Sequence, residues 1–113
     1  GGARMIGRAT ALKLAKQDFD ILIHTGGKSL EEAKKTSEMI GALSKKCEIV
    51  TGDLGDLKTI ESIKNKAHEM GEPLVLINNA GMRIHEIFEK ITYEDWKKIM
   101  TINVDAAFYV PKH

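Results

Sequence analysis

Leu74–Gly81 reads Leu-Val-Leu-Ile-Asn-Asn-Ala-Gly, a run of apolar residues that ends abruptly at two amide side chains. A short run rich in Val, Leu and Ile and entered through Pro73 is typical of a strand buried on both faces of a sheet. In open α/β sheets, ligands bind outside the carboxyl ends of such strands. Asn78 and Asn79 are therefore predicted to lie where a ligand binds.

Helical and extended stretches alternate around this run. Apolar periodicity predicts helices over about residues 5–16, 30–43, 57–70 and from 93 onward. Short β-branched runs predict two further strands, at Phe19–Thr25 and Cys47–Thr51. The residues expected to cap helices are Ser29, Asp56 and, as a weak relative of the capping box, Thr92 with Asp95. This alternation predicts an α/β fold with a doubly wound parallel sheet of the Rossmann type.

Composition indicates a soluble domain and excludes several classes of function. The 113 residues allow one domain at most, and 17 basic residues nearly cancel 16 acidic ones, so we expect no nucleic-acid or membrane partner. The single Cys47 excludes an internal disulfide and fits a reducing, cytoplasmic compartment. The four histidines show no metal-ligand spacing, so no metal site is expected. Because the chain begins inside a Gly-rich turn and ends inside a predicted helix, we expect a domain truncated at both ends.

Four motifs taken together resemble the short-chain dehydrogenase/reductase family. Residues 1–7 are similar to its Gly-x-x-x-Gly-x-Gly turn from the first Gly onward, and Asn78–Gly81 matches its Asn-Asn-Ala-Gly. Asp53 matches the Asp that follows the third strand, and Asn103 matches the Asn of the next long helix. The resemblance covers the whole chain and corresponds to about the first half of such an enzyme.

The resemblance implies an NAD(P)-dependent oxidoreductase that moves hydride between a nicotinamide and a small-molecule carbonyl or secondary alcohol, in a homo-oligomeric parent. The implied cofactor-binding residues are Gly1, Arg4, Ile6, Gly7, Asp53, Leu54, Asn79, Ala80 and Gly81. Asn103 is the implied catalytic residue: it bends its helix, and its carbonyl holds a water of the proton relay. The catalytic Ser and Tyr-x-x-x-Lys of the family would lie beyond His113, so the chain alone is expected to show no turnover.

Several of these residues also have plainer interpretations. Gly1 and Gly7 could simply open a helix, although backbone N–H groups at that helix N-terminus would suit a pyrophosphate. Asp53 could begin a turn, and the amide of Asn103 could be satisfied by a neighbouring loop. Asn78 is expected to be mainly structural, tying strand ends together, while Asn79 faces the cofactor.

Met5 departs from the family pattern, because the family has a Gly there that lets the backbone approach the pyrophosphate. Met5 is expected to crowd the phosphate or alter the turn, which keeps open an alternative: a degenerate, non-catalytic dinucleotide-binding or regulatory module. A Rossmann-type methyltransferase is a second alternative. It usually has an acidic residue after the second strand, which is missing here.

The end of the second predicted strand bears on the choice of cofactor. NAD-binding folds place an acidic residue there for the ribose 2′-OH, but this chain has His24-Thr25-Gly26-Gly27-Lys28. A carboxylate would repel a 2′-phosphate, so its absence favours NADP(H) over NAD(H). Arg4 is a candidate phosphate contact, and Lys28 a weaker one.

The family's first strand would precede Gly1, and in the common strand order it lies between the second and the fourth. We therefore expect a gap between Ile21–Ile23 and Val75–Ile77, because the backbone groups of both segments need partners.

Overall fold

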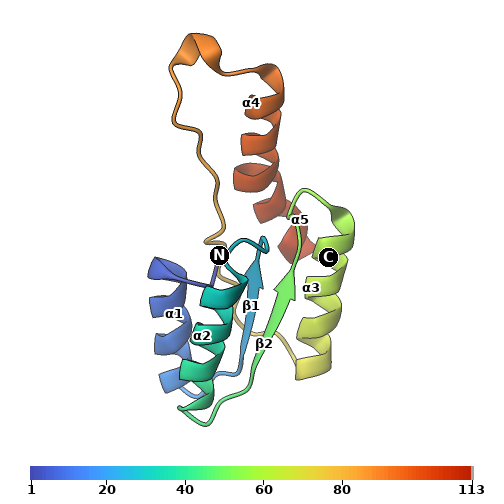
Figure 1. Ribbon diagram of the computed structural model, residues 1–113. Helices are drawn as coiled ribbons and strands as arrows, with labels where there is room; N and C mark the ends of the chain where they lie inside the picture. Colours follow the sequence, from blue (N-terminus) through green and yellow to red (C-terminus); the bar gives the residue numbers. More distant parts are fainter. Residues whose placement is uncertain (113) are drawn as a thin grey trace.

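The computed structural model describes residues 1–112 and has three layers. Helices α1 and α2 cover one face of a central sheet, and α3 and α5 cover the other (Figure 1). The elements in chain order are α1 (Met5–Lys16), β1 (Ile21–Thr25), α2 (Leu30–Gly41), β2 (Cys47–Thr51), α3 (Leu57–Met70), a 3-10 turn (Phe88–Lys90), α4 (Tyr93–Met100), a π-helical segment (Thr101–Asp105) and α5 (Ala106–Lys112). This order of helices and strands is that of a Rossmann-type α/β fold, as predicted.

The sheet within the described residues consists of β1 and β2, which pair in parallel. Their register places Ile21 beside Cys47 and Thr25 beside Thr51. Alternate residues of β1 are buried, and Ile23, at 1% exposure, packs in the core beside Ala33 and Ile40 of α2. The strand predicted at Phe19–Thr25 therefore begins two residues later than expected, at Ile21. The strand predicted at Cys47–Thr51 is confirmed.

Two of the three predicted caps are confirmed. The Asp56 carboxylate accepts from the backbone N–H of Lys58 at 2.9 Å, and Thr92 with Asp95 forms a complete capping box. The prediction for Ser29 was wrong, since its side chain makes no capping bond. Its backbone carbonyl instead accepts from the N–H of Ala33 at 2.9 Å, so α2 starts on backbone bonds alone.

The predicted strand at Leu74–Gly81 is not a strand in the structure. Within residues 1–112, no hydrogen bond reaches the backbone of residues 74–77. Their apolar residues are also open to solvent, with exposed fractions from 48% at Leu76 to 75% at Leu74. A ladder needs a partner at about 4.8 Å, and none lies beside this segment. The expected gap is confirmed in that β1 and residues 74–77 are not hydrogen-bonded to each other.

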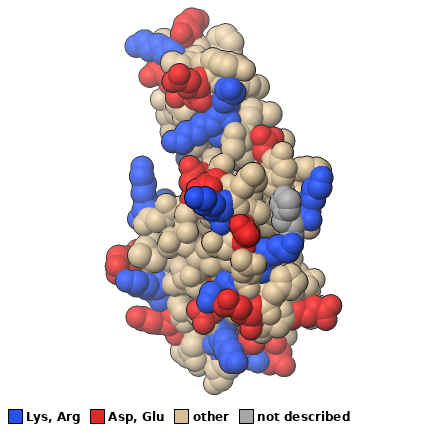
Figure 2. All heavy atoms as spheres, turned by 90° about the vertical axis from the view of Figure 1, so that its right-hand side faces the viewer, with Lys and Arg blue, Asp and Glu red and all other residues tan. Residues whose placement is uncertain are grey.

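The segment that leads into α4 and α4 itself extend away from the sheet (Figure 1), which gives the molecule extents of 50 × 26 × 19 Å. Basic and acidic side chains are interspersed over the face shown in Figure 2. No helix formed by residues 1–112 has both the length and the apolar character that crossing a bilayer requires.

Candidate functional site

The site is built around Gly1 and Gly2, which lie at the carboxyl end of β1. A Cβ on Gly1 would sit 2.7 Å from the backbone nitrogen of Ala80, and a Cβ on Gly2 would sit 3.2 Å from Cγ2 of Ile23. The backbone of these two residues is thus held between β1 and the segment that contains Ala80. A side chain on Gly1 would meet backbone atoms, which cannot swing aside.

Gly7 brings the first turn of α1 against this backbone. A Cβ on Gly7 would overlap the carbonyl of Gly1, so only glycine allows the two segments to approach this closely. The free N–H groups of the α1 N-terminus then face the carboxyl edge of the sheet, and the first turn of α1 carries no acidic residue. Such an end attracts an anion through its N–H groups and the helix dipole.

Met5, the first residue of α1, has φ +54°, in the left-handed region that favours glycine. Its side chain is 78% exposed, so it points to solvent and packs on little of the protein. The departure from the family pattern therefore takes the form of a strained backbone at the position where a Gly would be relaxed.

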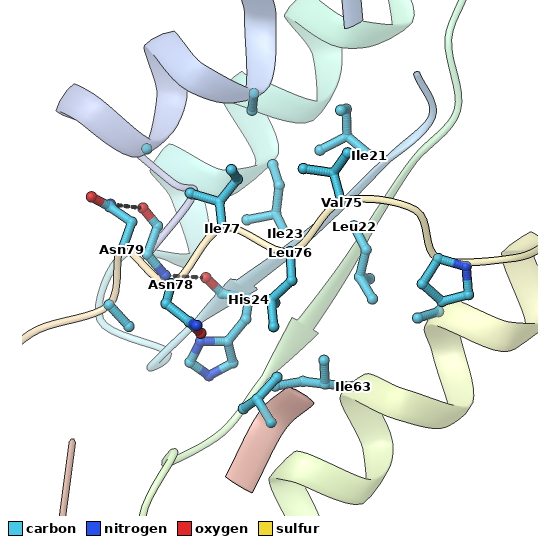
Figure 3. Close-up of a pocket in the computed structure, with 18 of the residues that line it drawn as sticks. Ile21, Leu22, Ile23, His24, Ile63, Val75, Leu76, Ile77, Asn78 and Asn79 are labelled. Carbon is cyan, nitrogen blue, oxygen red and sulfur yellow. Dashed lines mark hydrogen bonds between the residues drawn. The ribbon is translucent and has the colours of Figure 1, made fainter. Parts of the chain in front are cut away.

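Hydrogen bonds connect four chain segments at this edge of the sheet. The amide Nδ2 of Asn79 donates to the carbonyl of Gly1 at 2.9 Å, and the amino group of Gly1 donates to the carbonyl of His24 at 2.6 Å. Both are drawn as dashed lines in Figure 3. The imidazole Nε2 of His24 lies 2.8 Å from the carbonyl of Gly52, in the loop after β2. A carbonyl only accepts, so Nε2 carries the hydrogen.

His24 is held in its neutral form. Burial lowers its pKa below the ordinary 6.5, and the positive charge of the Gly1 amino group acts in the same direction. The bond to Gly52 and the charge of Asp53 oppose this shift, but burial is the larger effect. A neutral His24 keeps the end of β1 and the loop after β2 joined without adding a charge to the edge.

Three side chains that the sequence did not single out fix the Gly-rich turn to α2. The buried hydroxyl of Thr36 donates to the carbonyl of Ala3 at 2.7 Å and accepts from Nε of Arg8 at 2.8 Å. Arg8 also pairs with Glu32 at 2.8 Å, and this guanidinium lowers the pKa of the Glu32 carboxyl. The one available signal was Thr36, a hydroxyl on the apolar face of α2.

Asp53 and Leu54 lie in the loop that follows β2, at the same edge of the sheet. The carboxylate of Asp53 accepts from the N–H of Gly55 at 2.8 Å, so the plainer interpretation of Asp53 as a turn residue holds in the structure. Its side chain is exposed, which leaves it accessible to a ligand at this edge.

The structural tie expected of Asn78 is made by its neighbour Asn79. Asn79, expected to face a cofactor, ties its segment to Gly1, while no described hydrogen bond involves the side chain of Asn78. The reason is the extended backbone: neighbouring side chains point to opposite faces, and Gly1 lies on the Asn79 side.

Asn103 sits in the middle of the π-helical segment that separates α4 from α5. Its Oδ1 accepts from the N–H of Met82 and its Nδ2 donates to the carbonyl of Met82, both at 2.7 Å. The expected neighbouring-loop partner is therefore present. The long helix is also interrupted at Asn103, because a π-helical turn places an extra residue in the ladder.

Arg4 and Ile6 lie on the exposed outer side of the turn, and Arg4 forms the N-cap of α1. Lys28 lies in the loop after β1, beyond Gly27, whose φ of +101° requires a residue without a side chain. Neither Arg4 nor Lys28 forms an ion pair with any residue from 1 to 112. Both cations are thus available to an incoming anion.

The chain itself contains one Tyr-x-x-x-Lys spacing, formed by Tyr93 and Lys97. The Nζ of Lys97 lies 5.1 Å from the centre of the Tyr93 ring. Both belong to α4, which extends away from the sheet, and Tyr93 is 72% exposed (Figure 1). Because Figure 1 shows α4 apart from the start of α1, we do not assign this pair to the site.

Among residues 1–112, the lone thiol and the metal-ligating side chains form no second centre. Burial raises the pKa of the Cys47 thiol, which keeps it protonated and unreactive. Over residues 1–112, His, Cys, Asp and Glu side chains form no group that could hold a metal ion.

Comparison with known proteins connects this geometry to a family. A family model described as short chain dehydrogenase matches residues 1–113. The chain is 38% identical over 104 residues to an uncharacterised oxidoreductase, YohF, of Escherichia coli, covering 91% of this chain and 41% of that protein. It is 36% identical over 110 residues to an L-2,3-butanediol dehydrogenase of Corynebacterium glutamicum, covering 96% of this chain and 43% of that one.

Among solved structures, a short chain dehydrogenase from Burkholderia cenocepacia in complex with NADP superposes with a TM-score of 0.92 at 28% identity. The superposition covers 99% of this chain and 46% of that one. The chain thus spans less than half the length of the proteins it matches.

Proposed function

This chain belongs to the short chain dehydrogenase family, and we propose that it forms the cofactor-binding part of an NADP(H)-dependent oxidoreductase that acts on a carbonyl or secondary alcohol. The proposal treats the 113 residues as part of one dinucleotide-binding domain. A relative named for L-2,3-butanediol supports a secondary alcohol as the substrate class.

The observation that carries this proposal is the contact between Gly7 and the carbonyl of Gly1, which only glycine permits. It places the N-terminus of α1 beside Asn79 and Ala80, so N–H groups and small side chains face one space. A dinucleotide needs both features, because N–H groups bind its pyrophosphate and small side chains allow its ribose to approach the backbone. Gly1, Ile6, Gly7, Ala80 and Gly81 would line this space.

The preference for NADP(H) rests on charge. The loop after β1 carries no carboxylate, and Arg4 and Lys28 have no acidic partner among the described residues. Cations free of partners are suited to a 2′-phosphate, whereas a 2′-hydroxyl gains little from them. Asp53 and Leu54 would hold the adenine at the end of β2.

When bound, the nicotinamide would supply or accept the hydride. Asn103 would serve the proton relay through its backbone carbonyl, since a π-helical segment changes which carbonyls find a helical partner. Its side chain is already committed to Met82, which fixes the helix at this point. We propose that the 113-residue chain binds cofactor without turnover, and that the intact parent is a cytoplasmic homo-oligomer.

Calorimetric titration of the chain with NADPH and with NADH tests the cofactor assignment. We expect NADPH to bind more tightly, and Arg4→Gln to reduce that advantage without weakening NADH. Lys13→Gln removes the same charge at an exposed position farther along α1 and should change neither affinity. Equal affinities for the two cofactors, or an equal effect of Lys13→Gln, would refute the NADP(H) preference.

The strained Met5 favours one alternative: a module that keeps the fold but has lost catalysis. Titration of Met5→Gly with NADPH discriminates the two functions. A large gain in affinity would support the degenerate module, because it would show that Met5 impairs the natural turn. An unchanged affinity supports the oxidoreductase. Membership of the family gives no support to the methyltransferase alternative.

A further inference from the structure

Helices α1 and α2 lie side by side (Figure 1), and a chain of hydrogen bonds joins them at the Gly-rich turn. Arg8 of α1 reaches α2 with its guanidinium: Nε donates to the hydroxyl of Thr36 at 2.8 Å, and Nη2 donates to the carbonyl of Glu32 at 3.0 Å. The hydroxyl of Thr36 lies 2.7 Å from the carbonyl of Ala3. Because Thr36 has no exposed surface, water does not compete for its hydrogen bonds.

Arg8 determines to which carbonyl the hydroxyl of Thr36 donates. A threonine within a helix often gives its proton to the carbonyl four residues earlier, which here is that of Glu32 at 3.1 Å. The guanidinium of Arg8 already donates both to that carbonyl and to the hydroxyl oxygen of Thr36. A hydroxyl has a single hydrogen, so the shorter bond, to Ala3, takes it. The guanidinium thus fixes a backbone carbonyl of the Gly-rich turn.

The bond to Ala3 sets the direction of the next backbone N–H. In a planar trans peptide the C=O and N–H groups point in opposite directions, and the peptide between Ala3 and Arg4 is trans. Since the carbonyl of Ala3 points to α2, the N–H of Arg4 points away from α2. That N–H has no hydrogen bond to any residue from 1 to 112, and the Arg4 side chain is exposed. Both donors of Arg4 are therefore directed to where an anion could reach them.

Arg8 also offsets a charge that would repel an anion at this place. Glu32 lies in the first turn of α2, and its carboxylate accepts from Nη2 of Arg8 at 2.8 Å. This bond is the largest cause that lowers the pKa of the Glu32 carboxyl, which therefore stays ionised and paired. A paired carboxylate repels a phosphate less than a free one does.

We propose that Arg8 and Thr36 are positioning residues that hold Arg4 in place for the 2′-phosphate of NADP(H), a role that rests on the function proposed above. The bond that Gly1 accepts holds the turn beside the N-terminus of α1, where a pyrophosphate would bind, and both cofactors have a pyrophosphate. The bond at Ala3 acts instead on Arg4, so it affects the one phosphate that NAD(H) lacks. The two bonds that fix the turn would thus serve different parts of the cofactor.

Calorimetric titrations of Thr36→Val and Thr36→Ser with NADPH and with NADH test this role. Valine keeps the shape of threonine but cannot bond to Ala3, whereas serine keeps the hydroxyl. We expect Thr36→Val to weaken NADPH binding by about fivefold and NADH binding by less than about twofold. Thr36→Ser should keep the ratio of the two affinities found in the unaltered chain. A merely structural role would lower both affinities together.

Arg8→Lys provides a second test that leaves the buried threonine in place. Lysine keeps the positive charge beside Glu32 but lacks the planar fork that reaches Glu32 and Thr36 together. We expect it to lower the ratio of NADPH to NADH affinity by about threefold. Arg83→Lys makes the same change at an exposed position and should leave the ratio unchanged. Combined with Arg4→Gln, Thr36→Val should change the ratio less than it does alone, because both changes act on one contact.

Three results would overturn this role while leaving the NADP(H) preference of the unaltered chain intact. Thr36→Val could weaken NADPH and NADH binding equally, or it could lower the affinity ratio no more than Thr36→Ser does. Arg8→Lys could leave the ratio as Arg83→Lys leaves it, and this result decides if circular dichroism shows that Thr36→Val is unfolded. Equal affinities of the unaltered chain for both cofactors would refute the NADP(H) preference itself and this role with it.

Discussion

Asn79 and Gly1, which are 78 positions apart, are joined by a hydrogen bond of 2.9 Å from the amide Nδ2 to the carbonyl oxygen. The amino group of Gly1 in turn donates a hydrogen bond to the carbonyl of His24, so three chain segments meet at this glycine. The Asn-Asn-Ala-Gly motif and the Gly-rich turn are thus two halves of one structural unit.

The first prediction concerns this bond. Asn79→Ala removes the donor to Gly1 and should lower the free energy of unfolding by about 1 kcal/mol, or weaken NADPH binding roughly fivefold where the turn must be ordered to bind. Denaturant unfolding and calorimetric titration measure the two effects. Asn78→Ala is the matched control, and an equal loss in that variant would show that the bond to Gly1 is unimportant.

Met5→Gly is expected to stabilise the protein. A residue with a side chain at φ +54° is strained by about 1–2 kcal/mol, and glycine removes that strain. Glycine also loses more conformational entropy on folding, which offsets part of the gain, so the free energy of unfolding should rise by up to about 1 kcal/mol. Met39→Gly, within α2, should destabilise by about 1 kcal/mol because its backbone is not in the left-handed region. Thermal unfolding of both variants should therefore shift in opposite directions.

Thr36 holds the Gly-rich turn to α2, and we expect its hydroxyl to contribute more to stability than its methyl group. Thr36→Val keeps the shape but leaves the carbonyl of Ala3 and Nε of Arg8 without their partner, at a cost of about 1–3 kcal/mol. Thr36→Ser keeps the hydroxyl and loses one methyl, at about 0.8 kcal/mol. Denaturant unfolding should rank Val below Ser; the reverse order would mean that the methyl packing dominates.

Asn103→Asp tests the two bonds to Met82. It keeps the acceptor but sets a carboxylate oxygen against the carbonyl of Met82, so stability should fall by about 1 kcal/mol at this exposed site. Asn65→Asp makes the same change on the exposed face of α3 and should have little effect on unfolding. Equal effects of the two changes would show that the loss comes from charge and not from Met82.

His24 predicts a pH dependence with a definite sign. Its pKa is lowered in the folded protein, so the unfolded chain binds the proton more readily. The contribution of neutral His24 is fully present above pH 6.5 and is lost as the pH falls below that value. Denaturant unfolding from pH 8 to pH 5 should show this loss, and His24→Gln should flatten it.

The other groups with shifted pKa values do not obscure the effect of His24→Gln on the pH dependence of unfolding. Burial lowers the pKa of the Gly1 amino group from 8.0, and that contribution has the same sign but remains in the His24→Gln variant. The lowered carboxyl pKa values of Asp18 and Glu32 act below pH 4.5, outside the range tested. A slope unchanged by His24→Gln between pH 6.5 and 5 would contradict the assignment.

The local elements of this protein could be predicted because short-range forces determine them. The helix Leu57–Met70 is capped by Asp56, the residue directly before it, and the strand Cys47–Thr51 follows from its own β-branched residues. The family resemblance likewise rested on residue types in order, and the family match confirms it.

The site contacts were harder to predict, because each depends on residues far apart in the chain. Nothing near Thr36 indicated that its hydroxyl binds Ala3, and neighbouring amides gave no reason to prefer Asn79 over Asn78 as the link to Gly1. Leu74–Ile77 shows the same division most clearly. Its composition alone determined that the segment is extended and apolar. Whether it is a strand was decided by tertiary structure, since a strand exists only where a second backbone lies at bonding distance.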